Sequence, residues 1–213
     1  MQKIKSENDL QDAIDKEHSW RLKEIHDLKS LVKTKKNQNS IETNVFSKSL
    51  VLISYSHWEG FVKNAARYYL SYIQFISLNK SQLSNRLVAS FVFQLTLSNK
   101  NRSEKIACIM EGITNPSYKF SINIDELVDA ESNLTSGILE KILSNIGIQT
   151  NAFKTKSQYI DSVILKFRND YAHGGFEYIN AEQAIEISEK VLELMSLFKT
   201  EIENSLCLKK YRI

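Results

Sequence analysis

The segment LKFRNDYAHGGF, residues 165–176, places an arginine, a histidine and two glycines at the end of a helix-like run. An imidazole titrates near neutral pH, so His173 is suited to take a proton from a ribose 2′-hydroxyl or to give one to a leaving 5′-oxygen. The Arg168 guanidinium is suited to bind phosphate oxygens in pairs and to stabilise the extra charge of a transition state. The two side chains together suffice for RNA cleavage by internal transesterification, which leaves a 2′,3′-cyclic phosphate and a 5′-hydroxyl.

The same two residues also fit a purely structural role. Cations near the C-terminus of a helix interact favourably with the helix dipole and often do no more than cap it. Five residues rotate by about 140° on an ideal helix, so Arg168 and His173 would not share a face. They would converge if the helix unwound at Ala172–His173, or if two protomers brought their motifs together about a rotation axis. The residue types alone leave both interpretations open.

Long helices are expected to position this motif. The chain of 213 residues contains one proline and six glycines, so it has few of the turn-forming residues that separate short strands. Apolar residues recur at helical spacing over residues 6–33, and a break is expected in this helix near Ser19–Trp20. A second helix is expected over 157–172, and Gly174 and Gly175 end it. Asn180 and Gln183 form a capping box for a last helix. The longest stripe consists of Val51, Tyr55, Trp58, Val62, Ala65, Tyr69, Tyr72 and Ile76.

The middle of the chain has a weaker pattern. Residues 85–97 fit a helix or a strand, and alternation over 115–124 indicates a short extended segment. Residues 135–148 are expected to form a short helix that ends at Gly147. The sequence therefore predicts an all-α helical bundle with long antiparallel helices. We expect a single domain over 1–213, with an N-terminal helical extension at 1–40 and a core bundle at 44–205.

The bulk composition narrows the class of protein. The net charge of +3 is too small to identify a nucleic-acid-binding protein, although local basic clusters occur. The charged N-terminus has no apolar signal core, no long apolar window predicts a membrane span, and the two distant cysteines fit a reducing compartment, so we expect a cytoplasmic protein. His18, His26 and His57 lack partners at metal-ligand spacing, so no metal site is predicted.

The segment FRNDYAHGGF resembles the R-x(4–6)-H signature of the HEPN superfamily (higher eukaryotes and prokaryotes nucleotide-binding domain). SYSHWEGFVKNAARYYLSYI (54–73) and ESNLTSGILEKILSNIGI (131–148) look like segments of a bacterial HEPN branch, so the resemblance covers about residues 44–200. It implies an all-α bundle, commonly a homodimer, and in many members an RNase of toxin–antitoxin, abortive-infection or CRISPR systems. Such enzymes usually cleave RNA without a metal or other cofactor, using the arginine and histidine of both protomers.

The resemblance also assigns roles to residues. Arg168 and His173 map onto the motif pair, and Asn169 corresponds to the polar residue that orients or supplements the site. Asp170 is a weaker candidate, for which a solvated charge is an equal alternative. Glu59 and Lys63 would face the motif from the long helix, but with Arg67 they also fit a solvated ion-pair stripe.

The expected partners follow from the same resemblance. They are an RNA substrate, a second copy of the chain, and an antitoxin or defence-system protein. HEPN toxins paired with a nucleotidyltransferase antitoxin usually carry a tyrosine two residues after the histidine, where this chain has Gly175. Two other interpretations stay open: a non-catalytic HEPN module that binds nucleotides or proteins, and a plain helical scaffold.

Overall fold

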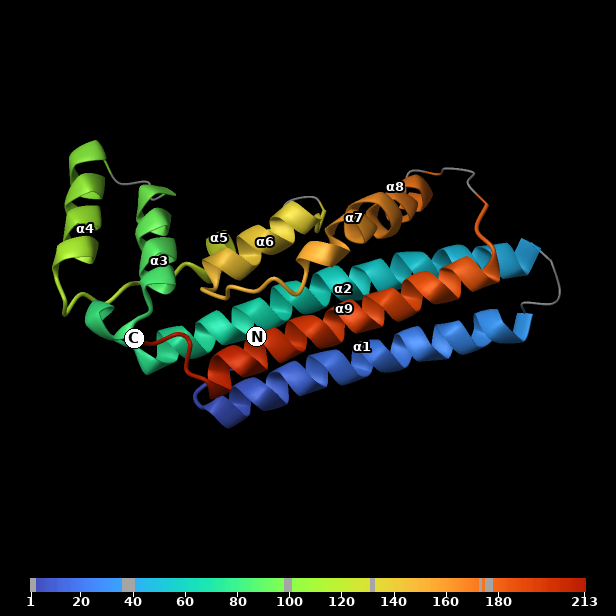
Figure 1. Cartoon of the computed structure of the whole chain (residues 1–213), viewed down its shortest axis with the longest axis horizontal. Coiled ribbons are helices and arrows are strands. Elements are labelled where there is room, and N and C mark those ends of the chain that lie inside the picture. The colour runs from blue at the N-terminus through green and yellow to red at the C-terminus, as the bar shows by residue number, and fades with distance from the viewer. Residues whose placement is uncertain (1–2, 36–40, 98–100, 131–132, 173, 175–177) are drawn as a thin grey trace.

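Three long helices lie side by side in the computed structural model of the chain (Figure 1). They are α1 (Glu7–Lys35), α2 (Ile41–Ile76) and α9 (Ala181–Cys207), and α2 packs against both of the others. The structure describes residues 3–35, 41–97, 101–130, 133–172, 174 and 178–213. The predicted all-α fold is confirmed, and the described residues form no strand beyond an isolated bridge between Leu83 and Arg212.

The core of the bundle follows from the apolar stripe of α2. Seven of the eight stripe positions are buried and the eighth, Ile76, is partly buried. Trp58 and Phe61 each contact Phe198 of α9 edge to face, with ring centroids 6.3 Å apart. Each such aromatic side chain buries roughly 150–250 Å². The predicted role of this stripe as core is therefore confirmed.

A second layer of shorter helices covers one side of α2 (Figure 1). Its helices reach α2 through α5 and α8, while α3 packs on α4 and α6. The π-helical turn η4 leads directly into α8. The elements of the layer are η2 (Lys80–Gln82), α3 (Asn85–Leu97), α4 (Arg102–Thr114), α5 (Ile124–Leu127), α6 (Ser136–Asn145), η3 (Lys154–Lys156), α7 (Ser157–Tyr159), η4 (Ile160–Ile164) and α8 (Leu165–Ala172).

Several local expectations can be compared with these bounds. α1 continues through Ser19–Trp20, so the expected break is wrong, because the helix buries residues on both sides of that point against the bundle. The ambiguous stretch 85–97 is helix α3. Residues 115–123 lie outside the helices and form no strand. The Asn180–Gln183 capping box is confirmed, with the Gln183 N–H donating to Asn180 Oδ1 at 2.8 Å.

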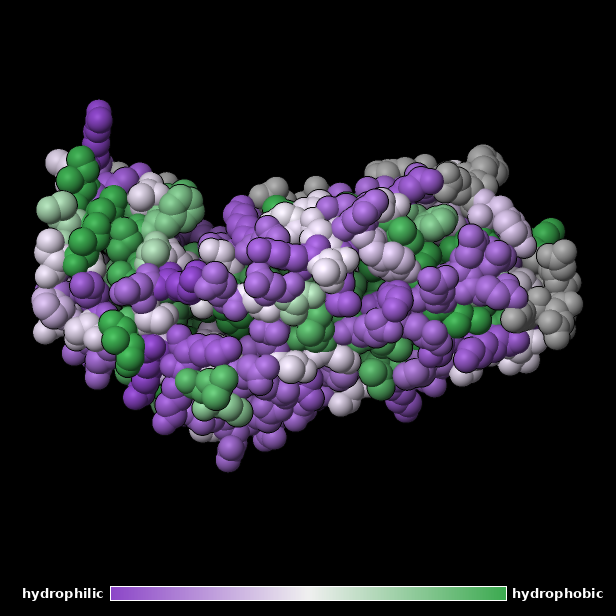
Figure 2. Space-filling model, viewed as in Figure 1, coloured by the Kyte–Doolittle hydropathy of each residue, from purple (hydrophilic) through white to green (hydrophobic). Residues whose placement is uncertain are grey.

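The hairpin of α3 and α4 extends away from the bundle and exposes apolar side chains. Only Gly112 of α4 is buried. Apolar residues gather over both helices in the space-filling view (Figure 2), and the exposed ones are Phe93, Leu97, Ile106, Met110 and Ile113. Among the described helices, none has an apolar stretch long enough to cross a membrane.

Candidate active site along α2

The π-helical turn determines how the motif helix α8 begins. The Leu165 N–H donates to the carbonyl of Ile160, five residues earlier, where a regular α-helix would use a partner four residues away. The turn before α8 therefore contains one residue more than a regular α-helical turn. The extra residue changes which side chains of α8 face α2. Residues 157–172 were predicted as one helix; they form α7, η4 and α8 in succession.

Arg168 lies half-buried on α8 and is held on two sides. Its guanidinium carbon lies 5.2 Å from the ring centroid of Tyr55 on α2. Its Nη1 donates a hydrogen bond to Asn169 Oδ1 at 2.8 Å. A guanidinium carries five N–H donors, so further donors are left for a ligand. His173 and Gly175 lie outside the described residues, and Gly174 has a positive φ of 78°, as expected for a residue that ends a helix.

Tyr55 connects the position of Arg168 to the buried core of the bundle. Its hydroxyl accepts a hydrogen bond of 2.7 Å from the Leu134 N–H, and the residue is 2% exposed. Burial, together with the nearby Glu59 carboxylate, raises the pKa of Tyr55 far above the usual value of a phenol. The ring therefore stays neutral and presents its electron-rich face to Arg168.

A groove of about 280 Å³ runs beside Arg168 along one face of α2. The structure thus brings three predicted site residues, Arg168, Glu59 and Lys63, to one cavity. Arg67 lies one helical turn beyond Lys63 on the same face. The lining consists of Tyr55, Ser56, Glu59, Gly60, Lys63, Asn64, Arg67 and Arg168.

The groove has an excess of positive charge. Lys63 Nζ lies 3.5 Å from Glu59 Oε1, and both side chains are only partly exposed. Arg67 Nη2 lies 3.1 Å from Asp125 Oδ1 of α5, whose side chain is 84% exposed. Three cations therefore line a cavity that holds one carboxylate within it and one at its rim. A cleft with one dominant sign of charge raises the local concentration of oppositely charged ligands.

Gly60 also lines the groove, although no sequence pattern marked it as a site residue. A Cβ at this position would lie 2.8 Å from Arg21 Nη1 of α1. Arg21 is buried and donates through Nη2 to Glu17 Oε2 at 2.9 Å, and Asn64 of the groove donates to the same oxygen at 3.0 Å. A glycine in the middle of a long helix is the signal that would have indicated this close approach.

Asp170 does not line the groove. It lies two residues beyond Arg168, about 200° around the helix and therefore on the opposite face of α8. Its Oδ2 is buried and has no hydrogen-bond partner among the described residues.

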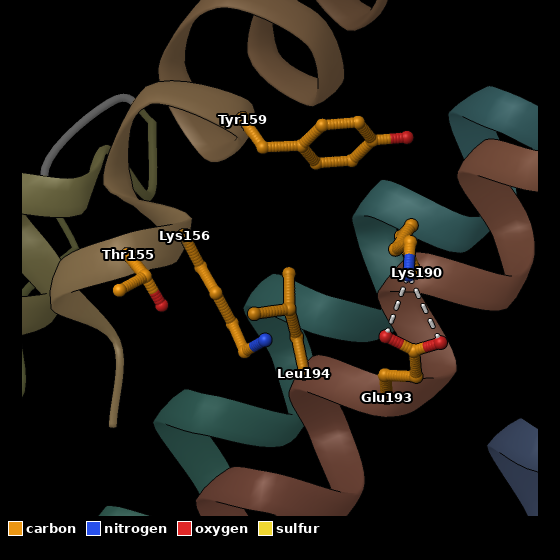
Figure 3. Close-up of a pocket in the computed structure, with 6 residues that line it drawn as sticks. All are labelled: Thr155, Lys156, Tyr159, Lys190, Glu193 and Leu194. Atoms are coloured by element: carbon orange, nitrogen blue, oxygen red, sulfur yellow. Dashed lines mark hydrogen bonds and ion pairs between the residues drawn. The ribbon is translucent and has the colours of Figure 1, made fainter.

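A second cavity of about 190 Å³ lies between α9 and the segment that precedes η4 (Figure 3). Lys190 and Glu193 form an ion pair of 3.0 Å there, and Lys156 extends toward Leu194. Burial and the Glu186 and Glu193 carboxylates raise the pKa of Tyr159 to about 12. Arg168 and Asn169, the motif residues that the structure describes at this end of α8, do not line this cavity, and it shares no described lining residue with the groove on α2.

A family model described as HEPN_MAE_28990-like HEPN matches residues 10–211, almost the whole chain. The match includes α1 from Leu10 onward, which the sequence resemblance at about 44–200 did not reach. Neither a search of curated proteins nor a search of solved structures returned a match.

Proposed function

Because the chain belongs to the HEPN superfamily, we propose that it is an endoribonuclease that cleaves RNA without a metal. The observation that carries this proposal is the position of Arg168. The side chain is held between Tyr55 and Asn169 at the edge of a cationic groove, with donors left for a phosphate. A cap that only satisfied its own helix would need neither the aromatic support nor the groove.

The reaction is an in-line attack of a ribose 2′-hydroxyl on the adjacent phosphorus. His173 takes the hydroxyl proton as general base, or donates a proton to the departing 5′-oxygen as general acid. Arg168 binds the non-bridging oxygens and stabilises the charge that grows on them. Asn169 orients the guanidinium through the bond to Nη1. The products are a 2′,3′-cyclic phosphate and a 5′-hydroxyl.

The active unit we propose is a homodimer, in which the motifs of two protomers meet in one composite site. Its biological role would be that of a toxin or phage-defence effector controlled by an antitoxin or another partner protein. The proposal comes from the family, in which many all-α dimers act in this way.

The test is an RNA cleavage assay in the presence of EDTA. We compare the wild type with Arg168→Ala and His173→Ala, and use Arg102→Ala as the matched control, since Arg102 is an exposed arginine on α4. We expect the wild type and the control to give cyclic-phosphate ends, and both motif variants to lose roughly 10²-fold or more in rate. Intact RNA with a confirmed wild-type dimer would favour a non-catalytic HEPN binding module instead.

A further inference from the structure

We propose that the groove along α2 binds the phosphates of the RNA strand next to the cleaved bond. In this arrangement Lys63 and Arg67 hold the backbone, and Asp125 is a carboxylate that the RNA displaces. The subsite depends on the proposed function for its substrate, and it extends that function to residues outside the R-x(4–6)-H motif. In this arrangement the RNA strand runs along α2 from Arg168 toward α5.

Two of the cations lie one helical turn apart on one wall of the groove. Lys63 and Arg67 are four residues apart on α2, so their positions are about 6 Å apart along one helix face. Neighbouring phosphates of an extended single strand have a comparable spacing. Arg168 enters from α8 over Tyr55, one turn before Glu59, whose carboxylate pairs with Lys63. A strand anchored at Arg168 can therefore continue past Glu59, with one phosphate opposite Lys63 and the next opposite Arg67.

Arg67 is placed to bind an anion, and its present partner is a weakly held carboxylate. Its one ion pair in the described structure is with Asp125, whose side chain is 84% exposed. Exposed pairs of this kind contribute little and are screened by salt, so a phosphate can replace the carboxylate at small cost. The Nε of Arg67 is buried without a hydrogen-bond partner among the described residues. A phosphate that replaces Asp125 binds the terminal nitrogens of Arg67, and a turn of the guanidinium toward the groove would let Nε join in a bidentate contact.

The lining of the groove favours a piece of a nucleic-acid backbone over a compact apolar ligand. Its volume of about 280 Å³ is close to the lower end of the range of roughly 300–1,000 Å³ for ligand pockets, which are lined mainly by apolar side chains. Its lining is dominated by charged and polar side chains. A cavity of this kind suits one sugar–phosphate unit of a longer strand that enters and leaves along the surface.

The experiment measures binding separately from cleavage. A labelled single-stranded RNA is titrated against full-length protein carrying His173→Ala, which prevents cleavage under the proposed mechanism. We add Lys63→Ala, Arg67→Ala or Asp125→Asn and measure Kd at several salt concentrations. We expect each lost cation to weaken binding and to lower the slope of log K against log salt by about 0.7, the value for one single-strand phosphate contact. We expect Asp125→Asn to tighten binding several-fold.

Three controls make the result specific. Lys23→Ala removes an exposed lysine that lies about 200° around α1 from Arg21, away from the groove, and should leave Kd and slope unchanged. Arg67→Lys keeps the charge and should keep the slope. In Arg67→Ala protein, the second substitution Asp125→Asn should not tighten RNA binding, because the Asp125 carboxylate then no longer competes with RNA for Arg67. Thermal melting of each variant checks that the fold is retained.

The outcomes separate this inference from the proposed function. Unchanged Kd and slope for Arg67→Ala and Asp125→Asn, in a protein that does cleave RNA, would overturn the subsite alone. The predicted changes in binding, without any cleavage by the wild type, would support the subsite and contradict the nuclease. Competition by polyglutamate as effective as that of RNA of equal charge would also overturn the assignment to nucleic acid.

Discussion

Tyr55 couples the core to the motif arginine at the scale of single residues. Its hydroxyl binds the Leu134 N–H, and its ring lies under the Arg168 guanidinium. The first contact stabilises the fold, while the second positions a charge at the groove. A substitution that removes only the hydroxyl separates the two contributions.

We expect Tyr55→Phe to lower the free energy of unfolding by about 1–3 kcal/mol, because the buried Leu134 N–H loses its partner. RNA cleavage should be largely retained, since the ring still supports Arg168. Urea denaturation and the cleavage assay check both statements. Tyr178→Phe is the matched control, because Tyr178 is 64% exposed and its hydroxyl contributes little. A variant as stable as the wild type, or one as inactive as Arg168→Ala, would contradict the assignment.

The site was only partly predictable from residue types. The arginine–histidine pair stands out because both side chains have strong chemistry at a helix end, and Glu59 and Lys63 follow from the resemblance. Tyr55 could be predicted only as core, since periodicity reports burial and not the partner of a hydroxyl. The contact with Arg168 joins residues more than a hundred positions apart, and no local pattern specifies such a pair.

At the scale of elements, the turn η4 is the part of the site that periodicity did not predict. Apolar residues over 157–172 fit a single helix, and one extra residue in a turn leaves almost the same spacing. The long helices were easier to predict from sequence, because the apolar stripes of α2 and α9 each repeat over many turns. The helix over 85–97 was ambiguous from sequence because its apolar run fits both periods, and packing on α4 and α6 decides it.

We expect Asp161 to anchor η4 to α6. Its carboxylate accepts a hydrogen bond of 2.8 Å from the Ser136 N–H, at the first turn of α6. Asp161→Ala should lower the free energy of unfolding by about 1 kcal/mol, as for the loss of a helix cap, and Asp161→Asn by less, because it keeps an acceptor. Denaturant titrations measure this, with the exposed Asp12→Ala as control. Equal stability of Asp161→Ala and the wild type would exclude the anchor.

At the scale of the whole molecule, the bundle presents its candidate site on an outer face. The groove lies on α2 between Arg168 of α8 and the edge of α2 that contacts Arg21 and Glu17 of α1 through Gly60 and Asn64. Arg168 is therefore accessible to a second protomer as well as to RNA. An outward-facing site of this kind is compatible with a composite active site at a two-fold axis.

The composite site makes a prediction about mixed subunits. Arg168→Ala and His173→Ala proteins should each be inactive, but a mixture that exchanges subunits should regain part of the activity. Each heterodimer then carries one complete pair, with Arg168 from one protomer and His173 from the other. The measurement is RNA cleavage after co-expression, with light scattering to confirm dimers at the assay concentration. Mixing Arg168→Ala with the double variant Arg168→Ala/His173→Ala supplies the control, because no complete pair can form. If the complementary mixture stays as inactive as this control while dimers exchange, one pair shared between two protomers is not sufficient. Either the arginine and histidine then act within one protomer, with α8 unwound at its end to bring them together, or the composite site needs both pairs.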